Sequence, residues 1–196
     1  MIKVGVTGGI GSGKSTFCRV WKNLGAAVYF ADDAAKELMI TNPELISKLK
    51  AAFGESTYHS DGSLNKKHLI REAFEKGEVD SLNKIVHPAV AKDFRAFVQK
   101  AESENRQIVV KEAALLLLGG RPDDLDLIVL ILSEKENRVA RVIQRDGVSK
   151  ADVESRDRKQ PVFDQLIDMA DYIIKNNGTV EELEAEAEKL YNLILD

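Results

Sequence analysis

The sequence predicts an α/β fold in which a parallel β-sheet is flanked by helices and carries helical additions. Short β-branched runs alternate with helical segments, a glycine-rich segment separates the first run from the first helix, and a long middle stretch has only helical periodicity. The 196 residues are enough for one α/β core with inserted subdomains.

The first part of the chain alternates strand and helix. Residues 2–7 form a β-branched run closed by glycines, which is typical of a buried strand. Hydrophobic residues recur with helical spacing over residues 15–24, and Gly25 follows as a stop signal. A second strand is expected at residues 27–30 and a second helix at residues 32–39, so the strands should pair in parallel through right-handed crossovers.

The middle of the chain, residues 42–106, has no convincing strand pattern. Residues 43–53, 66–76 and 88–104 are helical in period. Several hydrophobic residues could share one helical face, namely Leu64, Leu69, Ile70, Phe74, Leu82, Ile85 and Val86. A helical insertion in the α/β core is the simplest interpretation.

Strands return in the last part of the chain, at residues 107–111, 127–132 and 172–175. Thr179 and Glu182 have the spacing of a capping box and begin a terminal helix that runs through Leu195.

Two charged helices are expected between the fourth and fifth strands. A capping box at residues 133–136 opens a helix to about Arg145, and Ser149 begins a second helix that Pro161 ends. The chain is then expected to divide into three parts. The core is made of residues 1–41, 107–132 and 161–196, the helical insertion of residues 42–106, and the lid of residues 133–160.

Composition limits the classes of partner. The net charge is −4, with 28 basic and 32 acidic residues, so no basic excess points to nucleic acid and any anion site must be local. Cys18 is the only cysteine, which excludes an internal disulfide and a multi-cysteine metal site. Apolar runs are too short to span a membrane, and the first residues do not form a secretory signal, so a cytoplasmic protein is expected.

Residues 8–15 (GGIGSGKS) match the phosphate-binding pattern G-x-x-x-x-G-K-[ST] at every fixed position, with a strand before and a helix after. Glycines let backbone N–H groups converge on phosphate oxygens, and the helix N-terminus adds its positive dipole end. Lys14 supplies a mobile charge, and the Ser15 hydroxyl can bind Mg²⁺. The expected contacts with ATP come from Gly9, Gly11, Ser12, Gly13, Lys14, Ser15 and Thr16.

The loop alone does not choose the reaction. The guanine motif [NT]-K-x-D and the switch motif D-x-x-G are absent, and Asn83-Lys84 is the nearest approach. The long apolar strand ending in Asp that motor ATPases carry is also missing, because Lys111 precedes Glu112. A small-molecule kinase remains, with a P-loop core, an acceptor-binding insertion and a lid.

Arginines mark the expected lid. Arg138, Arg141 and Arg145 are spaced by three and four residues, which places them on one helix face, where they can stabilise transferring phosphoryl oxygens. The alternative is a solvated face paired with Glu134, Glu136 and Asp146.

Two carboxylates follow predicted strands. Asp32 is either the base that takes the acceptor's proton or an N-cap of the next helix. Glu112 could hold Mg²⁺ through water or cap a helix after it.

Taken together, these residues resemble the dephospho-coenzyme A kinase family from residue 2 to about residue 195. The segment VTGGIGSGKST (6–16) is similar to that family's loop, and LNKIVHP (82–88) is similar to its His-Pro segment. RVIQRD (141–146) resembles its lid, Arg156 and Gln160 keep its R-x-x-x-Q spacing, and ADYIIKN (170–176) resembles its last strand.

The resemblance implies transfer of the ATP γ-phosphate, with Mg²⁺, to the ribose 3′-hydroxyl of dephospho-coenzyme A. It implies Lys14 and Ser15 at the phosphates and metal, Asp32 as base and Arg141 at the reacting phosphates. It also implies that Arg145 belongs to the lid. Asn176 would lie near adenine, and His87 on the acceptor side.

One departure from the family pattern concerns the base. Phe30 stands where the family has a first Asp, and Asp33 follows Asp32 directly, so the assignment is open by one residue. Two further hypotheses remain: a nucleoside, nucleotide or shikimate-type kinase, and a nucleotide-binding regulator without catalysis.

Overall fold

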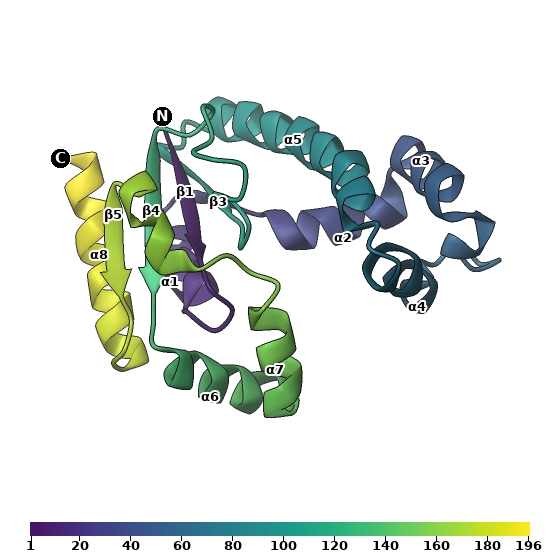
Figure 1. Ribbon diagram of the computed structural model, residues 1–196. Coiled ribbons are helices and arrows are strands. Elements are labelled where there is room, and N and C mark those ends of the chain that lie inside the picture. The colour runs from purple at the N-terminus through teal and green to yellow at the C-terminus, as the bar shows by residue number, and fades with distance from the viewer. The chain divides into compact units, whose positions relative to one another are not determined.

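The computed structural model describes the backbone of all 196 residues and every side chain except that of Phe74, so this residue of the predicted hydrophobic face lies outside the described side chains. Figure 1 shows the elements. The strands are β1 (Ile2–Gly8), β2 (Ala27–Phe30), β3 (Ile108–Glu112), β4 (Leu127–Leu132) and β5 (Tyr172–Lys175). The α-helices are α1 (Lys14–Asn23), α2 (Ala31–Thr41), α3 (Pro43–Phe53), α4 (Lys66–Leu69), α5 (Val79–Ser103), α6 (Lys135–Asp146), α7 (Lys150–Asp157) and α8 (Val180–Leu195). Shorter helical segments are η1 (Glu55–Thr57), η2 (Ile70–Glu75) and η3 (Phe163–Met169).

The chain divides into two compact units, Met1–Phe30 with Gln99–Asp196, and Ala31–Val98. We call them the sheet unit and the helical unit. The sheet unit holds all five strands in the order β2-β3-β1-β4-β5, and every neighbouring pair is parallel. All the strands predicted from the sequence are confirmed, as is their parallel pairing.

The main core lies between the sheet and the helices α1 and α8. Trp21 of α1 is fully buried and donates its indole N–H to the Ala187 carbonyl at 2.8 Å. Its ring packs edge-on against the ring of Tyr191, with the two ring centroids 5.7 Å apart. Cys18 is buried in the same core, and burial raises the pKa of its thiol, with the charge of Glu112 adding to the effect. The thiol therefore acts as a small core group.

The opposite face of β1 is covered by the segment after β3. A Cβ at Gly5 would lie 2.5 Å from Leu116 Cδ2 and 2.8 Å from Leu125 Cδ1, so a glycine is needed in mid-strand. The sheet is thus buried on both faces, as is usual for parallel strands.

Within the helical unit, the prediction that no regular strand occurs between residues 42 and 106 is confirmed for the backbone described there. Two details of the prediction are wrong. Residues 66–76 are not one α-helix, because α4 passes into the π-helical segment η2, and α5 begins at Val79 rather than at Pro88. Of the hydrophobic residues that could share one helical face, Ile70 is 51% exposed, whereas Leu69 and Leu82 are buried.

The two predicted helices between β4 and β5 are both present. Ser149 caps α7 in a capping box with Asp152, and Thr179 caps α8 with Glu182. The box predicted at residues 133–136 is wrong, because Glu134 is the N-cap of α6 and makes no side-chain cap bond. Among the described residues, no helix is both long and apolar enough to cross a membrane.

Candidate active site

The glycine-rich loop lies between β1 and α1, as predicted, and its glycines are required by close neighbours. Gly11 has φ +76°, and a Cβ there would lie 2.4 Å from the Arg138 carbonyl oxygen. Gly13 has φ +104°, and a Cβ there would lie 2.4 Å from Asn176 Nδ2. Left-handed backbone and close packing therefore both exclude side chains at these positions.

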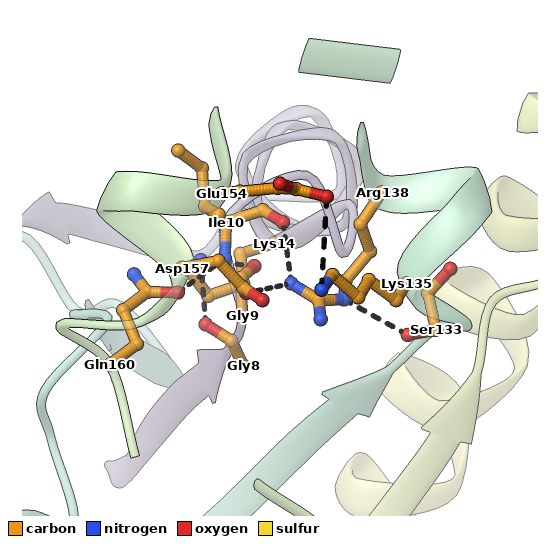
Figure 2. A network of polar contacts seen from close by, with 10 residues as sticks. All are labelled: Gly8, Gly9, Ile10, Lys14, Ser133, Lys135, Arg138, Glu154, Asp157 and Gln160. Carbon is orange, nitrogen blue, oxygen red and sulfur yellow. Dashed lines mark hydrogen bonds and ion pairs between the residues drawn. The ribbon is translucent and has the colours of Figure 1, made fainter. Parts of the chain in front are cut away.

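Lys14 is the first residue of α1 and is only 9% exposed. Its ammonium donates to the carbonyl of Gly8 at 2.9 Å and to that of Gly9 at 3.2 Å (Figure 2). Glu112 Oε1 lies 3.9 Å from the same nitrogen. The positive charge of Lys14 is thus held beside the loop by two loop carbonyls and the carboxylate of Glu112.

Glu112 is the last residue of β3 and is 7% exposed. It pairs in register with Val6 on one side and with Phe30 on the other, at the carboxyl edge where ligands of parallel sheets bind. Turns rather than a helix follow it, so the alternative that it caps a helix is wrong. Its proximity to Lys14 makes it a candidate site residue, whereas the sequence left its role open.

Two hydroxyls stand in the first turn of α1. Ser15 is exposed there. Thr16 Oγ1 accepts a hydrogen bond from Arg19 Nη2 at 3.1 Å. The N-terminal N–H groups and dipole of α1 face the loop, which favours an anion at this point.

Asn176 joins the loop to the segment after β5. Its side chain is buried and donates through Nδ2 to the Ser12 carbonyl at 2.8 Å. Arg141 of α6 donates to the Asn176 carbonyl at 3.1 Å, to Asn176 Oδ1 at 3.3 Å and to the Gly178 carbonyl at 3.1 Å. The structure therefore brings Asn176, Arg141 and the loop together.

The three arginines of α6 do not act as one set, although they share a helix. Arg138 forms an ion pair with Asp157 of α7 and donates to the Ile10 carbonyl. Arg145 instead binds the neighbouring Asp146 at 2.7 Å, a hydrogen bond that raises the pKa of Arg145 and lowers that of Asp146. The solvated-face alternative thus describes Arg145 and not the other two.

Asp32, Asp33 and His87 belong to the helical unit. Asp32 is exposed in the first turn of α2, so the alternative that it is the N-cap is wrong. Asp33 forms an ion pair with Lys36 at 2.7 Å. His87 is exposed inside α5, and it is not a helix boundary despite the proline after it.

A pocket of about 580 Å³ opens beside the loop in the sheet unit, with Gly9, Ser133, Lys135, Arg138, Gln160 and Asn177 in its lining. Sequence reasoning did not assign Asp157 or the Gln160 side chain to the loop. Gln160 had a weak signal in its spacing from Arg156, and Asp157 had none.

A parallel sheet with a phosphate loop after its first strand, a helical insertion after its second and an arginine-bearing helix after its fourth defines a P-loop kinase. The family model for dephospho-CoA kinases matches residues 2–182. A dephospho-CoA kinase from Salinibacter ruber is 38% identical over 192 residues, which cover 97% of this chain and 96% of that one. This chain belongs to the dephospho-CoA kinase family.

Solved structures agree with this membership. A crystal structure from Thermus thermophilus has a TM-score of 0.81 at 29% identity, over 97% of this chain and 96% of that one. The dephospho-CoA kinase from Campylobacter jejuni has a TM-score of 0.71 at 26% identity, over 98% of this chain and 96% of that one.

Proposed function

We propose that this protein transfers the γ-phosphoryl group of ATP to the ribose 3′-hydroxyl of dephospho-coenzyme A, giving coenzyme A and ADP. The observation that carries the proposal is the Lys14 loop, complete in sequence and geometry, in a chain that the kinase family matches over residues 2–182. Because ATP and coenzyme A are both used in the cytoplasm, we place the reaction there.

On the donor side, backbone N–H groups of Gly9, Gly11, Ser12 and Gly13 would surround the phosphates. Lys14 would leave the carbonyls of Gly8 and Gly9 for the oxygens between the β- and γ-phosphates. This exchange replaces neutral acceptors with charged ones, which form stronger hydrogen bonds.

The residues present fit a magnesium ion. Ser15 offers an exposed hydroxyl, and Glu112 offers a buried carboxylate 3.9 Å from Lys14 Nζ that can accept hydrogen bonds from metal-bound water. The described side chains include no cluster of three or more His, Cys, Asp or Glu that could hold a metal alone, so most ligands would be phosphate oxygens and water. Bound Mg²⁺ would neutralise charge on the β- and γ-phosphates.

Arg141 and Asn176 would form the rest of the nucleotide site. Asn176 is fixed against Ser12, so it can line the adenine side, and Arg141 donates to Asn176 from α6. Arg145 would exchange Asp146 for phosphate, because its guanidinium is largely exposed. Two arginines of the segment 133–160, which we propose as the lid, would thus meet the donor.

On the acceptor side, Asp32 would take the proton of the 3′-hydroxyl as its oxygen attacks phosphorus. Asp32 lies in the first turn of α2, two positions after the last residue of β2. It is exposed, so a substrate hydroxyl could approach it. His87 would contact the acceptor within the helical segment 42–106. The nucleotide core would be residues 1–41 with 107–132 and 161–196.

The test is an ADP-release assay with ATP and Mg²⁺ across several acceptors. Dephospho-coenzyme A should stimulate ADP release far above the rate without acceptor, whereas nucleosides, nucleoside monophosphates and shikimate should not. Equal rates with and without dephospho-coenzyme A would defeat the proposal. Stimulation by shikimate or a nucleoside instead would support the second kinase hypothesis, and nucleotide binding without turnover would support the regulator.

A further inference from the structure

Ile10, inside the phosphate loop, is bonded on both sides to the segment that carries α6 and α7 (Figure 2). Its N–H donates to Gln160 Oε1 at 2.7 Å, and its carbonyl accepts from Arg138 Nη1 at 3.3 Å. Arg138 lies on α6, and Gln160 follows the end of α7 by three residues. The two peptide groups that flank Ile10 are therefore held from two places, α6 and the segment after α7.

Asp157 fixes the arginine in this position. Its carboxylate forms an ion pair with Arg138 Nη1 at 2.5 Å, and the two side chains are only 20% and 14% exposed. Arg138 Nε also donates to the Ser133 carbonyl at 3.1 Å. Charged hydrogen bonds with little solvent around them are strong and directional, so the guanidinium has one well-defined orientation.

The loop needs such support because Gly9 and Gly11 flank Ile10. Glycines tolerate most backbone angles, so the peptide groups on either side of Ile10 could rotate at little steric cost. Rotation of the peptide between Gly9 and Ile10 would take the Gly9 carbonyl away from Lys14 Nζ and from the Ser12 N–H, from which it accepts hydrogen bonds at 3.2 and 3.0 Å. Rotation of the peptide between Ile10 and Gly11 would turn the Ile10 carbonyl toward the phosphates in place of the Gly11 N–H. Both glycines are also required by the contact itself, since a Cβ at Gly9 would lie 2.9 Å from Arg138 Nη1 and one at Gly11 would lie 2.4 Å from the Arg138 carbonyl.

We propose that Gln160, Arg138 and Asp157 are positioning residues that orient the two peptide groups at Ile10 and so prepare the loop for the phosphates of ATP. The loop is then competent only while α6 and α7 are packed against it. The inference rests on the proposed function in taking ATP as the ligand, but not in the identity of the acceptor.

The alternative is that Gln160, Arg138 and Asp157 only hold α6 and α7 together, and a control variant tests it. Lys135 of α6 lies 3.9 Å from Glu154 of α7, so this pair joins the same two helices. No hydrogen bond or ion pair is found between Glu154 and the loop among the contacts described (Figure 2). Glu154→Gln thus weakens the helix pair and leaves the bonds to Ile10 in place.

The experiment is calorimetric titration of Mg·ATP into the full-length wild type, Gln160→Met, Asp157→Asn and Glu154→Gln, with the melting temperature of each free protein. Gln160→Met keeps the size of the side chain and removes the acceptor, so ATP should bind about five-fold more weakly, the effect of one hydrogen bond. Asp157→Asn should weaken ATP binding by a similar factor, and Glu154→Gln by less than about two-fold. In turnover, the KM for ATP should rise in the first two variants while the KM for the acceptor stays constant.

Unchanged ATP affinity in both folded Gln160→Met and Asp157→Asn would overturn the proposal. An equal loss in Glu154→Gln would also overturn it, because helix packing alone would then be responsible. If Gln160→Met fails to fold, Asp157→Asn decides between the outcomes, because it keeps the volume of the side chain and removes the charge that pairs with Arg138. A wild type that binds ATP but ignores dephospho-coenzyme A would defeat the proposed function and leave this comparison valid.

Discussion

Gly13 shows how much a single loop position depends on a distant side chain. Its φ of +104° and the 2.4 Å approach of Asn176 Nδ2 to a Cβ both oppose substitution. Gly13→Ala should strain the backbone by about 1 kcal/mol and displace Asn176 from Ser12, so ATP affinity should fall at least about ten-fold. Calorimetry and thermal unfolding measure the two effects.

Gly120 provides the control for this prediction. It has a similar φ of +98°, but nothing lies within 4 Å of its Cβ position. Gly120→Ala should therefore lower stability through strain and leave ATP affinity unchanged. Equal ATP affinity in the two alanine variants would show that the contact with Asn176 is not what the loop requires.

The base can be assigned by comparing two adjacent carboxylates. Asp32→Asn should lower kcat by about 100-fold or more, the usual contribution of a general base, while the Kd for ATP stays near the wild-type value. Asp33→Asn should have little effect, because that carboxylate pairs with Lys36 on the exposed side of α2. A larger loss of kcat in Asp33→Asn would transfer the role to Asp33.

Individual site residues differ in how far the sequence could predict them. The position of Lys14 and Ser15 at the start of α1, directly after the loop, was predictable because the loop's sequence pattern is contiguous. The bond from Ile10 to Gln160 joins residues 150 positions apart, so no local pattern signals it. Glu112 was ambiguous for a related reason: its role depends on β3 lying beside β1, which brings it to Lys14.

At the scale of elements, the two confirmed capping boxes should differ in their effect on stability. The helix α8 buries four residues (Leu183, Ala187, Leu190 and Tyr191), whereas α7 buries only Val153. Thr179→Ala should therefore lower the global free energy of unfolding by about 1 kcal/mol. Ser149→Ala should lower it less, because α7 can fray locally. Urea unfolding curves compare them, and equal losses would contradict this account.

The contact between β4 and the start of β5 should depend on pH. Asp171 accepts from the Ile128 N–H at 2.7 Å and pairs with Arg121 at 2.8 Å. Burial alone would raise the pKa of this carboxyl, but the bonds from Arg121 and Ile128 outweigh it and the pKa is lowered. A lowered folded pKa stabilises the protein above the unfolded pKa, and this contribution is lost as the pH falls through the folded value.

Asp171→Asn should therefore destabilise the protein at neutral pH, and its deficit relative to wild type should shrink as the pH falls through the folded pKa of the carboxyl. Chemical denaturation of both proteins across this range measures the difference. A deficit that is constant with pH would mean that the charge of Asp171 contributes nothing.

Elements were predictable where local and long-range preferences agree. The strands β1 and β4 are short runs rich in β-branched residues and are largely buried in the sheet, so the hydrophobic pattern was enough to predict them. The start of α5 was not predictable, because Pro88 is a local stop signal and the structure keeps the helix intact through it. The capping box at residues 133–136 failed because the Ser133 hydroxyl accepts from Arg141 instead, eight residues along the chain.

At the scale of the whole molecule, the two units carry different parts of the proposed reaction. The sheet unit holds the loop, Glu112, Asn176 and the α6 arginines, and the helical unit holds Asp32 and His87. The α/β class with a helical insertion was predictable because strand and helix patterns alternate in the core, whereas the hydrophobic residues of the insertion have only helical spacing. The contacts that join loop and lid were not, since they arise only when segments distant in sequence pack together.

The most direct test of the account is analysis of the product formed from ATP, Mg²⁺ and dephospho-coenzyme A, by mass spectrometry and phosphorus NMR. The wild type should give one ADP for each molecule of a product that is heavier by one phosphoryl group, attached at the ribose 3′-oxygen, and Lys14→Ala should give neither. Phosphate at another position, ADP without a phosphorylated product, or the same yield from Lys14→Ala would contradict it.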